Sequence, residues 1–227
     1  MELSSRKVFI SGGERYGELQ LLTAWGYSVT KEIYDADIVL FTGGADVNPE
    51  LYGHPRHRTT GPAEYRDECD IRNYQIAHAE QIPMFGICRG AQFLNVMQGG
   101  KMIQDIENHC ENHYMMLLDG TREQMFVTSC HHQAMLPNPD NAIIVAVAGR
   151  EVGASVYDED AKAFVHKRVG DIVEGVIFPK IRAFGVQGHP EFSFNSKQFQ
   201  QFRDWCKITL EETIVGIYDG VTDAATS

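Results

Sequence analysis

The apolar residues of the first half of the chain follow two alternating patterns. Short, continuous apolar runs are typical of strands that are buried on both faces, and they occupy residues 8–10, 38–41 and 83–88. Between and after them, apolar residues recur at helical spacing and predict helices over residues 16–25, 66–81 and 89–97. Because strands alternate with helices, the pattern predicts an α/β fold with a doubly wound, mostly parallel sheet and flanking helices.

The second half is richer in predicted strands. They cover residues 125–128, 142–148, 173–178 and 183–187, and an amphipathic helix over 196–210 follows them. Residues 46–65 contain three of the eight prolines and predict a long loop. Since no internal repeat or linker interrupts the chain, we expect one domain over residues 1–227, with a frayed tail at 219–227.

Composition and charge narrow the classes of partner and location. Hydrophobic residues make up 43% of the chain, which is enough for a sizeable core, and the net charge is −11. Such an acidic protein would repel nucleic acid and anionic membranes. No apolar run approaches the roughly 20 residues of a membrane helix, and the N-terminus lacks the apolar stretch of a signal peptide. The five cysteines are scattered, without a CxxC pair, so we expect a reducing, cytoplasmic location.

One cysteine lies in a segment that suggests catalysis. Gly86-Ile-Cys88-Arg-Gly90 stands between a predicted strand and a predicted helix and has the glycine spacing of a nucleophile elbow. Glycines remove the Cβ atoms that would clash in so sharp a turn, and a helix N-terminus favours the thiolate. A buried structural cysteine explains this segment alone equally well.

A second segment supplies a candidate base. In Gly188-His189-Pro190-Glu191, the histidine follows an apolar strand, at the edge where parallel-sheet enzymes gather catalytic groups. His189 can move a proton to and from a thiol, and Glu191 can hold the imidazole in the required tautomer. A surface His-Pro turn is the alternative, but it leaves the elbow on the same chain unexplained.

Two further segments are weaker signals. Gly43 and Gly44 follow a strand and could present backbone N–H groups to an oxyanion, although an ordinary turn has the same composition. Ser129-Cys-His-His-Gln133 suggests a metal site, with His54, His57, His109 and His113 as further ligands. We disfavour that interpretation because the spacing matches no known zinc pattern and adjacent residues on a strand point to opposite faces, so we expect neither a metal nor a cofactor.

Together these segments resemble the class I glutamine amidotransferase superfamily, most closely its γ-glutamyl-γ-aminobutyrate hydrolase-like branch. The resemblance extends from about Phe41 to Phe192 and follows the family's order. It rests on the following segments: Gly43 to Gly53, Arg66-Asp67, Pro83 to Val96, Gly99-Gly100 with Gln104-Asp105, Ser129 to Gln133, and Gly185 to Glu191.

The resemblance implies roles for individual residues. Cys88 is the expected nucleophile, His189 its general base and acid, and Glu191 the orienting partner. Backbone N–H groups of Gly44 and Arg89 are expected to form the oxyanion hole. The residues expected to contact the γ-glutamyl substrate are Gln92, His131, His132 and Gln133.

The chain departs from the family pattern at three places, all of which concern pocket shape. Gly188 replaces a bulky residue, Asp70 replaces a glutamate, and residues 148–174 match poorly and look short.

The implied reaction is hydrolysis of a γ-glutamyl amide through a γ-glutamyl thioester. If the leaving group is ammonia, the chain is a glutaminase subunit that needs a separate synthase partner. If it is a larger amine, the chain is a stand-alone γ-glutamyl hydrolase. A third interpretation is a catalytically decayed binding or regulatory relative, against which the intact Cys88, His189 and Glu191 argue. The sequence leaves the oligomeric state undetermined.

Overall fold

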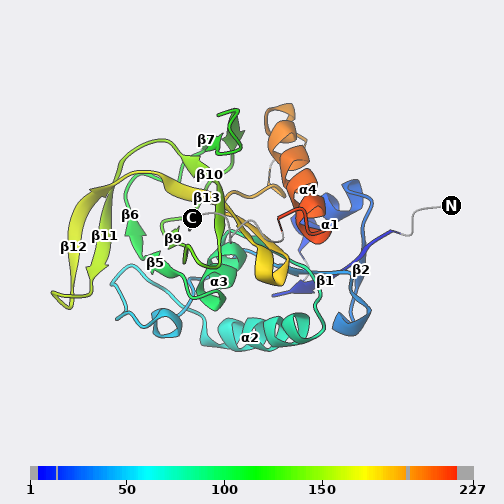
Figure 1. Ribbon diagram of the computed structural model, residues 1–227, viewed down its shortest axis with the longest axis horizontal. Coiled ribbons are helices and arrows are strands. Elements are labelled where there is room, and N and C mark those ends of the chain that lie inside the picture. The colour runs from blue at the N-terminus through cyan, green and yellow to red at the C-terminus, as the bar shows by residue number, and fades with distance from the viewer. Residues whose placement is uncertain (1–4, 14, 193–194, 219–227) are drawn as a thin grey trace.

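A computed structural model describes residues 5–13, 15–192 and 195–218. Its centre is a mixed sheet whose main path runs β2-β1-β3-β4-β14-β13-β10-β7-β8 (Figure 1). Five neighbouring strands are parallel: β2 (Ser28–Thr30), β1 (Lys7–Ser11), β3 (Ile38–Phe41), β4 (Met84–Ile87) and β14 (Ala183–Val186). The remaining strands of this path are antiparallel: β13 (Ile172–Phe178), β10 (Ile143–Ala148), β7 (His113–Leu117) and β8 (Gln124–Val127).

Shorter strands extend this arrangement on the side of the antiparallel half. β5 (Lys101–Ile103) pairs with β9 (Ala134–Leu136), which pairs with β13. A separate three-stranded sheet contains β12 (Ala163–Val169), β11 (Val152–Asp158) and β6 (Asp105–Ile106).

Helices cover both faces of the main sheet, as Figure 1 shows. On one face, α1 (Tyr16–Ala24) and α4 (Gln200–Ile214) contribute Leu21 and Phe202 to the larger buried cluster. On the other, α2 (Glu64–Ala79) and α3 (Arg89–Met97) contribute Ala77 and Phe93 to a second cluster. The two clusters enclose strands buried on both faces, which explains their continuous apolar runs.

The sequence-based α/β prediction is confirmed, with one refinement. Parallel pairing is limited to the three strands predicted in the first half, to β14 and to the short β2, which was not predicted, and the rest of the sheet is antiparallel. The helix predicted over 66–81 starts earlier, at Glu64, and that predicted over 196–210 is a short 3-10 turn, Lys197–Phe199, followed by α4. The tail expected at 219–227 lies outside the described residues.

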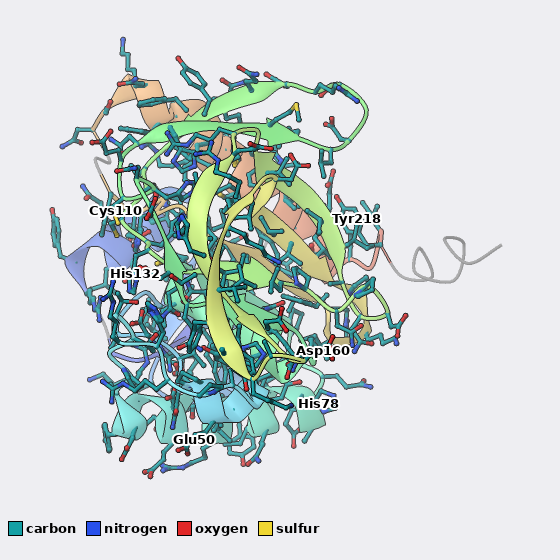
Figure 2. The ribbon with its side chains drawn as sticks, turned by 90° about the vertical axis from the view of Figure 1, so that its left-hand side faces the viewer. Glu50, His78, Cys110, His132, Asp160 and Tyr218 are labelled. Carbon is teal, nitrogen blue, oxygen red and sulfur yellow. The ribbon has the colours of Figure 1, made fainter. Side chains whose placement is uncertain are left out.

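The region 148–174, which looked short against the family pattern, holds a β-hairpin made of β11 and β12. Figure 2 shows this hairpin facing the viewer, with Asp160 at its turn. It packs on the long loop of residues 46–63: the Tyr157 and His54 ring centroids lie 4.8 Å apart, as do those of Phe164 and His57. Much of β12 is exposed and polar, so its residues carried too little apolar signal to predict a strand.

Among the helices of the described residues, none is both long and apolar enough to cross a membrane.

Candidate active site

Cys88 occupies a sharp turn between β4, which ends at Ile87, and α3, which begins at Arg89. Its backbone angles are φ 51° and ψ −108°, a conformation that L-residues adopt only under strain. The flanking glycines are required by the packing. A Cβ on Gly86 would lie 2.6 Å from the backbone nitrogen of Ala91, and one on Gly90 would lie 2.0 Å from the carbonyl oxygen of Phe41. The elbow therefore depends on the glycine spacing seen in the sequence.

The elbow faces a cavity of about 280 Å³. The structure brings most of the sequence-predicted site residues to its walls, although they come from distant parts of the chain. The lining residues are Gly44, Ala45, Asp46, Gly61, Cys88, Gln92, Cys130, His131, His132 and Gln133.

His189 and Glu191 form a buried pair beside this cavity. The Nδ1 of His189 lies 2.7 Å from Oε1 of Glu191, and both residues are only 5% exposed. Thr128 fixes the backbone, since its Oγ1 accepts from the N–H of His189 and donates to its carbonyl. The ring of Phe192 stacks on the imidazole at a centroid distance of 4.1 Å. These contacts hold His189 in the tautomer with Nδ1–H toward the carboxylate.

Cys130 is a site residue that the sequence analysis missed. Its Sγ lies 3.1 Å from Nε2 of His189, and a hydrogen bond also joins it to Cys88. Cys88 and His189 both lie close to Gly43: a Cβ there would be 3.9 Å from Cβ of Cys88 and 3.0 Å from Cε1 of His189. Cys130 thus connects the elbow cysteine to the histidine. The sequence analysis gave roles to His131, His132 and Gln133 of the segment Ser129–Gln133 but none to its cysteine.

The charges of these three residues are linked. Burial opposes the cationic form of His189, but its contacts with Cys130 and Glu191 outweigh that effect and raise its pKa to about 9. The hydrogen bonds from Cys88 and His189 lower the pKa of Cys130 to about 4. The same bond to Cys130, together with burial, raises the pKa of Cys88. At neutral pH these shifts favour a His189 imidazolium beside one thiolate of the hydrogen-bonded Cys88–Cys130 pair, with the negative charge favoured on Cys130.

Replacing Glu191 with glutamine is expected to make the reactivity of this thiolate more dependent on pH. Without the carboxylate, the pKa of His189 falls from about 9, so the imidazolium that stabilises the thiolate is lost at a lower pH. Wild-type carboxamidomethylation by iodoacetamide should change little between the two pKa values. In Glu191→Gln, the upper end of this plateau should move from about pH 9 to about pH 8, a shift of about one pKa unit, while the reactivity at pH 7 stays near that of the wild type.

Mass spectrometry of the alkylated peptides against pH measures this effect. The matched control is Glu151→Gln, an exposed carboxylate on the β11 side of the molecule, which should keep the wild-type profile. Superimposable profiles for wild type and Glu191→Gln would show that Glu191 does not control the charge of His189.

The predicted oxyanion donors lie next to the elbow. The backbone N–H of Arg89, at the start of α3, donates to the sulfur of Cys88. Gly44 lines the cavity with φ 152°, and a Cβ on it would lie 3.2 Å from Nη1 of Arg66. Gly44 and Arg89 therefore stay the predicted oxyanion donors, since a glycine loop and a helix N-terminus can both present N–H groups to a developing oxyanion.

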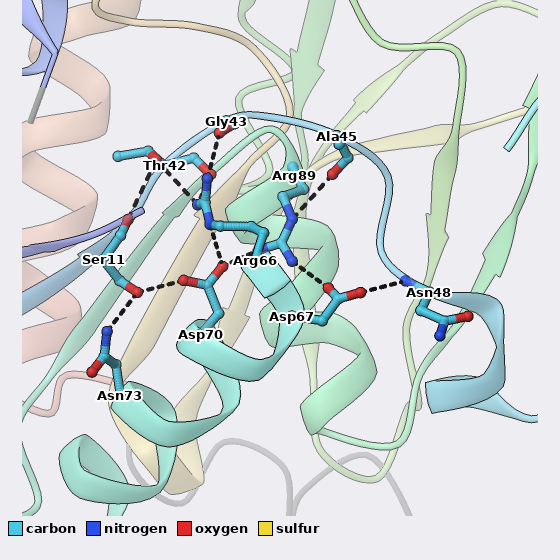
Figure 3. A network of polar contacts seen from close by, with 10 residues as sticks. All are labelled: Ser11, Thr42, Gly43, Ala45, Asn48, Arg66, Asp67, Asp70, Asn73 and Arg89. Atoms are coloured by element: carbon cyan, nitrogen blue, oxygen red, sulfur yellow. Dashed lines mark hydrogen bonds and ion pairs between the residues drawn. The ribbon is translucent and has the colours of Figure 1, made fainter. Parts of the chain in front are cut away.

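A buried ionic network holds this glycine loop in place (Figure 3). The guanidinium of Arg89 donates to the carboxylates of Asp67 and Asp70, and its Nε donates to the carbonyl of Ala45 at 3.1 Å. Arg66 contacts Asp70 at 2.9 Å and donates to the carbonyls of Thr42 and Gly43 at 2.9 and 3.2 Å. Asp70, one of the departures from the family pattern, therefore lies behind the cavity wall and not in the cavity.

Gly188, a second departure, does not enlarge the cavity. A Cβ on this residue would lie 2.8 Å from Cζ of Phe202 and 3.0 Å from the carbonyl oxygen of Thr128. The space that a bulkier residue would need is filled by α4, so Gly188 is a packing adaptation to Phe202.

Comparison with known proteins gives consistent results. The family model described as peptidase C26 matches residues 26–191. The glutamine amidotransferase-like protein YvdE of Lactococcus lactis is 25% identical over 185 residues, which are 73% of this chain and 70% of that protein. A GMP synthase (glutamine-hydrolyzing) of Rhizobium etli is 27% identical over 141 residues, 57% of this chain but only 23% of the synthase.

Solved structures share the fold. The crystal structure of a glutamine amidotransferase from Thermotoga maritima superposes with a TM-score of 0.60 over 93% of this chain and 98% of that chain, at 12% sequence identity.

Proposed function

Since the chain belongs to the peptidase C26 family, within the class I glutamine amidotransferase superfamily, we propose that it hydrolyses a γ-glutamyl amide bond with Cys88 as the nucleophile. One observation carries this proposal. The strained elbow at Cys88 faces a small polar cavity, and Cys130 links the same cysteine to the buried His189–Glu191 pair.

The charge state of the site suggests how Cys88 is activated. The Cys88 thiol transfers its proton to the Cys130 thiolate, and the Cys88 thiolate then attacks the γ-carbonyl carbon of the substrate. Backbone N–H groups of Gly44 and Arg89 hold the oxyanion. The His189 imidazolium gives its proton to the departing amine as the C–N bond breaks, and a γ-glutamyl thioester remains on Cys88.

The second half-reaction restores the site. Neutral His189 takes a proton from water, and the resulting hydroxide attacks the thioester carbon. The C–S bond breaks, glutamate leaves, and Cys88 departs as a thiolate that recovers its proton from Cys130. His189 is again an imidazolium and Cys130 again a thiolate, so the cycle closes without a cofactor.

We further propose that the leaving group is an amine larger than ammonia. The sequence raised two objections to this branch, the glycine at 188 and an apparently shortened 148–174 region. Phe202 fills the space at Gly188, and β11 and β12 form a full hairpin against the 46–63 loop. That loop supplies Asp46 and Gly61 to the cavity wall, and Asp46 lies 3.2 Å from Nε2 of His132.

Glutamate release by the isolated chain tests both proposals. We expect turnover of γ-glutamyl-γ-aminobutyrate without any partner. The kcat/KM for glutamine should be at least about 10-fold lower, because glutamine lacks the larger amine group whose contacts would stabilise the transition state. The reaction is followed by a coupled glutamate assay, with Cys88→Ala as the background control.

The alternative is a glutaminase subunit that supplies ammonia to a separate synthase. The similarity to a GMP synthase suggests one such partner to test. Adding the amidating part of a GMP synthase should leave both rates unchanged. Glutamine turnover that appears only with that partner, with no turnover of γ-glutamyl-γ-aminobutyrate, would favour the subunit and overturn the choice of leaving group.

A further inference from the structure

Four titratable side chains converge in the interior, and one of them, His131, also lines the cavity at Cys88. Three imidazole Nε2 atoms face the same carboxylate oxygen, Oε1 of Glu174 on β13. The distances are 2.9 Å from His109, 3.1 Å from His113 and 3.6 Å from His131. All four residues are buried, and both His109 and Glu174 are 0% exposed.

The outer nitrogens of two of these rings fix where their lone pairs point. Nδ1 of His113 lies 3.0 Å from the carbonyl oxygen of Glu111, and Nδ1 of His131 lies 2.9 Å from that of Gln133. A carbonyl only accepts, so each Nδ1 carries the hydrogen, and in a neutral ring Nε2 then presents a lone pair. Both lone pairs face a carboxylate oxygen, which cannot donate a hydrogen bond to them.

This arrangement leaves polar atoms in the interior without partners. Among the described side chains, Nε2 of His131 and Oε2 of Glu174 are buried and form no hydrogen bond. Unpaired buried polar atoms are costly, and lone pairs that converge on a carboxylate add repulsion. A cation between the rings and the carboxylate would remove both problems.

The donor set is one that binds zinc. Histidines that ligate a metal through Nε2 usually donate Nδ1–H to a backbone carbonyl or carboxylate, as His113 and His131 do. The ligand atoms of His109, His131 and Glu174 lie within 4.8 Å of one another. Ligands about 2.0–2.1 Å from a tetrahedral zinc lie roughly 3.4 Å apart, and the Nε2–Oε1 separations of the cluster bracket that value.

We propose that His109, His131 and Glu174 bind a Zn²⁺ ion. His113, which contacts Glu174 but lies outside this group of mutually close ligand atoms, would move toward the ion to become the fourth ligand. Four protein ligands and complete burial make this a closed, structural site. Binding requires a proton on Nδ1 of His109, so the 3.5 Å contact from Arg150 to that atom is given up, while Arg150 keeps its 2.8 Å bond to the carbonyl of Asn108. The ion would tie the segment that carries Cys130 to β13.

This proposal reverses the expectation, drawn from the spacing of the histidines, that the chain binds no metal. His131 and His132 do point in different directions, and His132 contacts Asp46 on the cavity side. The fold, however, adds Glu174 and the His109–His113 segment to His131, and no sequence spacing connects those three segments.

Metal content of the full chain tests the proposal. After dialysis against a chelator, titration with Zn²⁺ by calorimetry and elemental analysis should give one tightly bound ion per chain and a higher Tm. Glu174→Gln and His131→Ala should each reduce binding at least about 100-fold. His166→Ala removes an exposed histidine of β12 and should bind as the wild type does.

Cobalt substitution keeps the test valid if a cluster variant does not fold. Co²⁺ bound to the wild-type chain should show the intense visible bands of tetrahedral coordination without a sulfur-to-metal charge-transfer band. Such a sulfur band would place the ion on a cysteine and overturn the proposal. Absence of stoichiometric Zn²⁺ binding would overturn it too.

Discussion

Replacing Cys88 with alanine is expected to lower the turnover of γ-glutamyl substrates by at least about 10⁴-fold, because the proposed reaction has no covalent intermediate without this sulfur. The residual rate would come from binding and from the oxyanion donors alone. Stopped assays of glutamate release over the substrate range that saturates the wild type measure the loss in kcat.

Cys130 provides the sharpest comparison, because two sulfurs share one site and only Cys130 contacts His189 directly. If Cys88 is the nucleophile and Cys130 relays its proton, Cys130→Ala should retain catalysis, with kcat reduced about 100-fold, the scale of a lost proton-transfer step. Cys69→Ala, a half-buried cysteine of α2, is the matched control and should have wild-type activity.

Covalent labelling identifies the reacting sulfur independently of turnover. A diazo-ketone analogue of glutamine should modify Cys88 in the wild type and in Cys130→Ala, and mass spectrometry of the labelled peptide locates the adduct. Label on Cys130, together with activity that survives in Cys88→Ala, would mean that the roles of the two cysteines are reversed. A chain that neither reacts with the analogue nor turns over substrate would be a decayed relative.

Replacing Asp70 with alanine is expected to reduce the free energy of unfolding by about 3–5 kcal/mol, which is the usual effect of removing one partner from a buried ion pair. Asp70 is 0% exposed, and it accepts from Arg66, from Arg89 and from the hydroxyl of Ser11. In Asp70→Ala, the buried Arg89 guanidinium keeps Asp67 as its remaining carboxylate partner. Urea denaturation followed by circular dichroism gives the change as a shift in midpoint.

An exposed pair supplies the control for this measurement. Glu151 and Arg168 are 3.7 Å apart and more than half exposed, so Glu151→Gln should change stability by no more than about 0.5 kcal/mol. Equal midpoints for Asp70→Ala and Glu151→Gln would show that the buried network contributes little. Because Arg66 and Arg89 also hold the carbonyls of Thr42, Gly43 and Ala45, Asp70→Ala should lower activity even where the chain remains folded.

Local patterns were sufficient for the elements that surround the elbow. The apolar runs predicted β1, β3 and β4 to within a residue or so, and α3 was predicted at its observed bounds, Arg89–Met97. Strands buried on both faces and a helix between glycines have strong signals that do not depend on distant residues. The hairpin of β11 and β12 was missed because its stability comes from pairing and from the 46–63 loop rather than from its own apolar content.

By itself, then, the sequence determined the α/β class and the family of this protein, and the glycine-flanked turn at Cys88, because these depend on residues close together in the chain. The tertiary structure alone decided which sulfur contacts His189, how Asp70 and Arg89 support the glycine loop, and that three histidines meet Glu174 in the interior. Those features depend on distances between segments far apart in sequence, which become defined only when the sheet forms and brings its strand ends together.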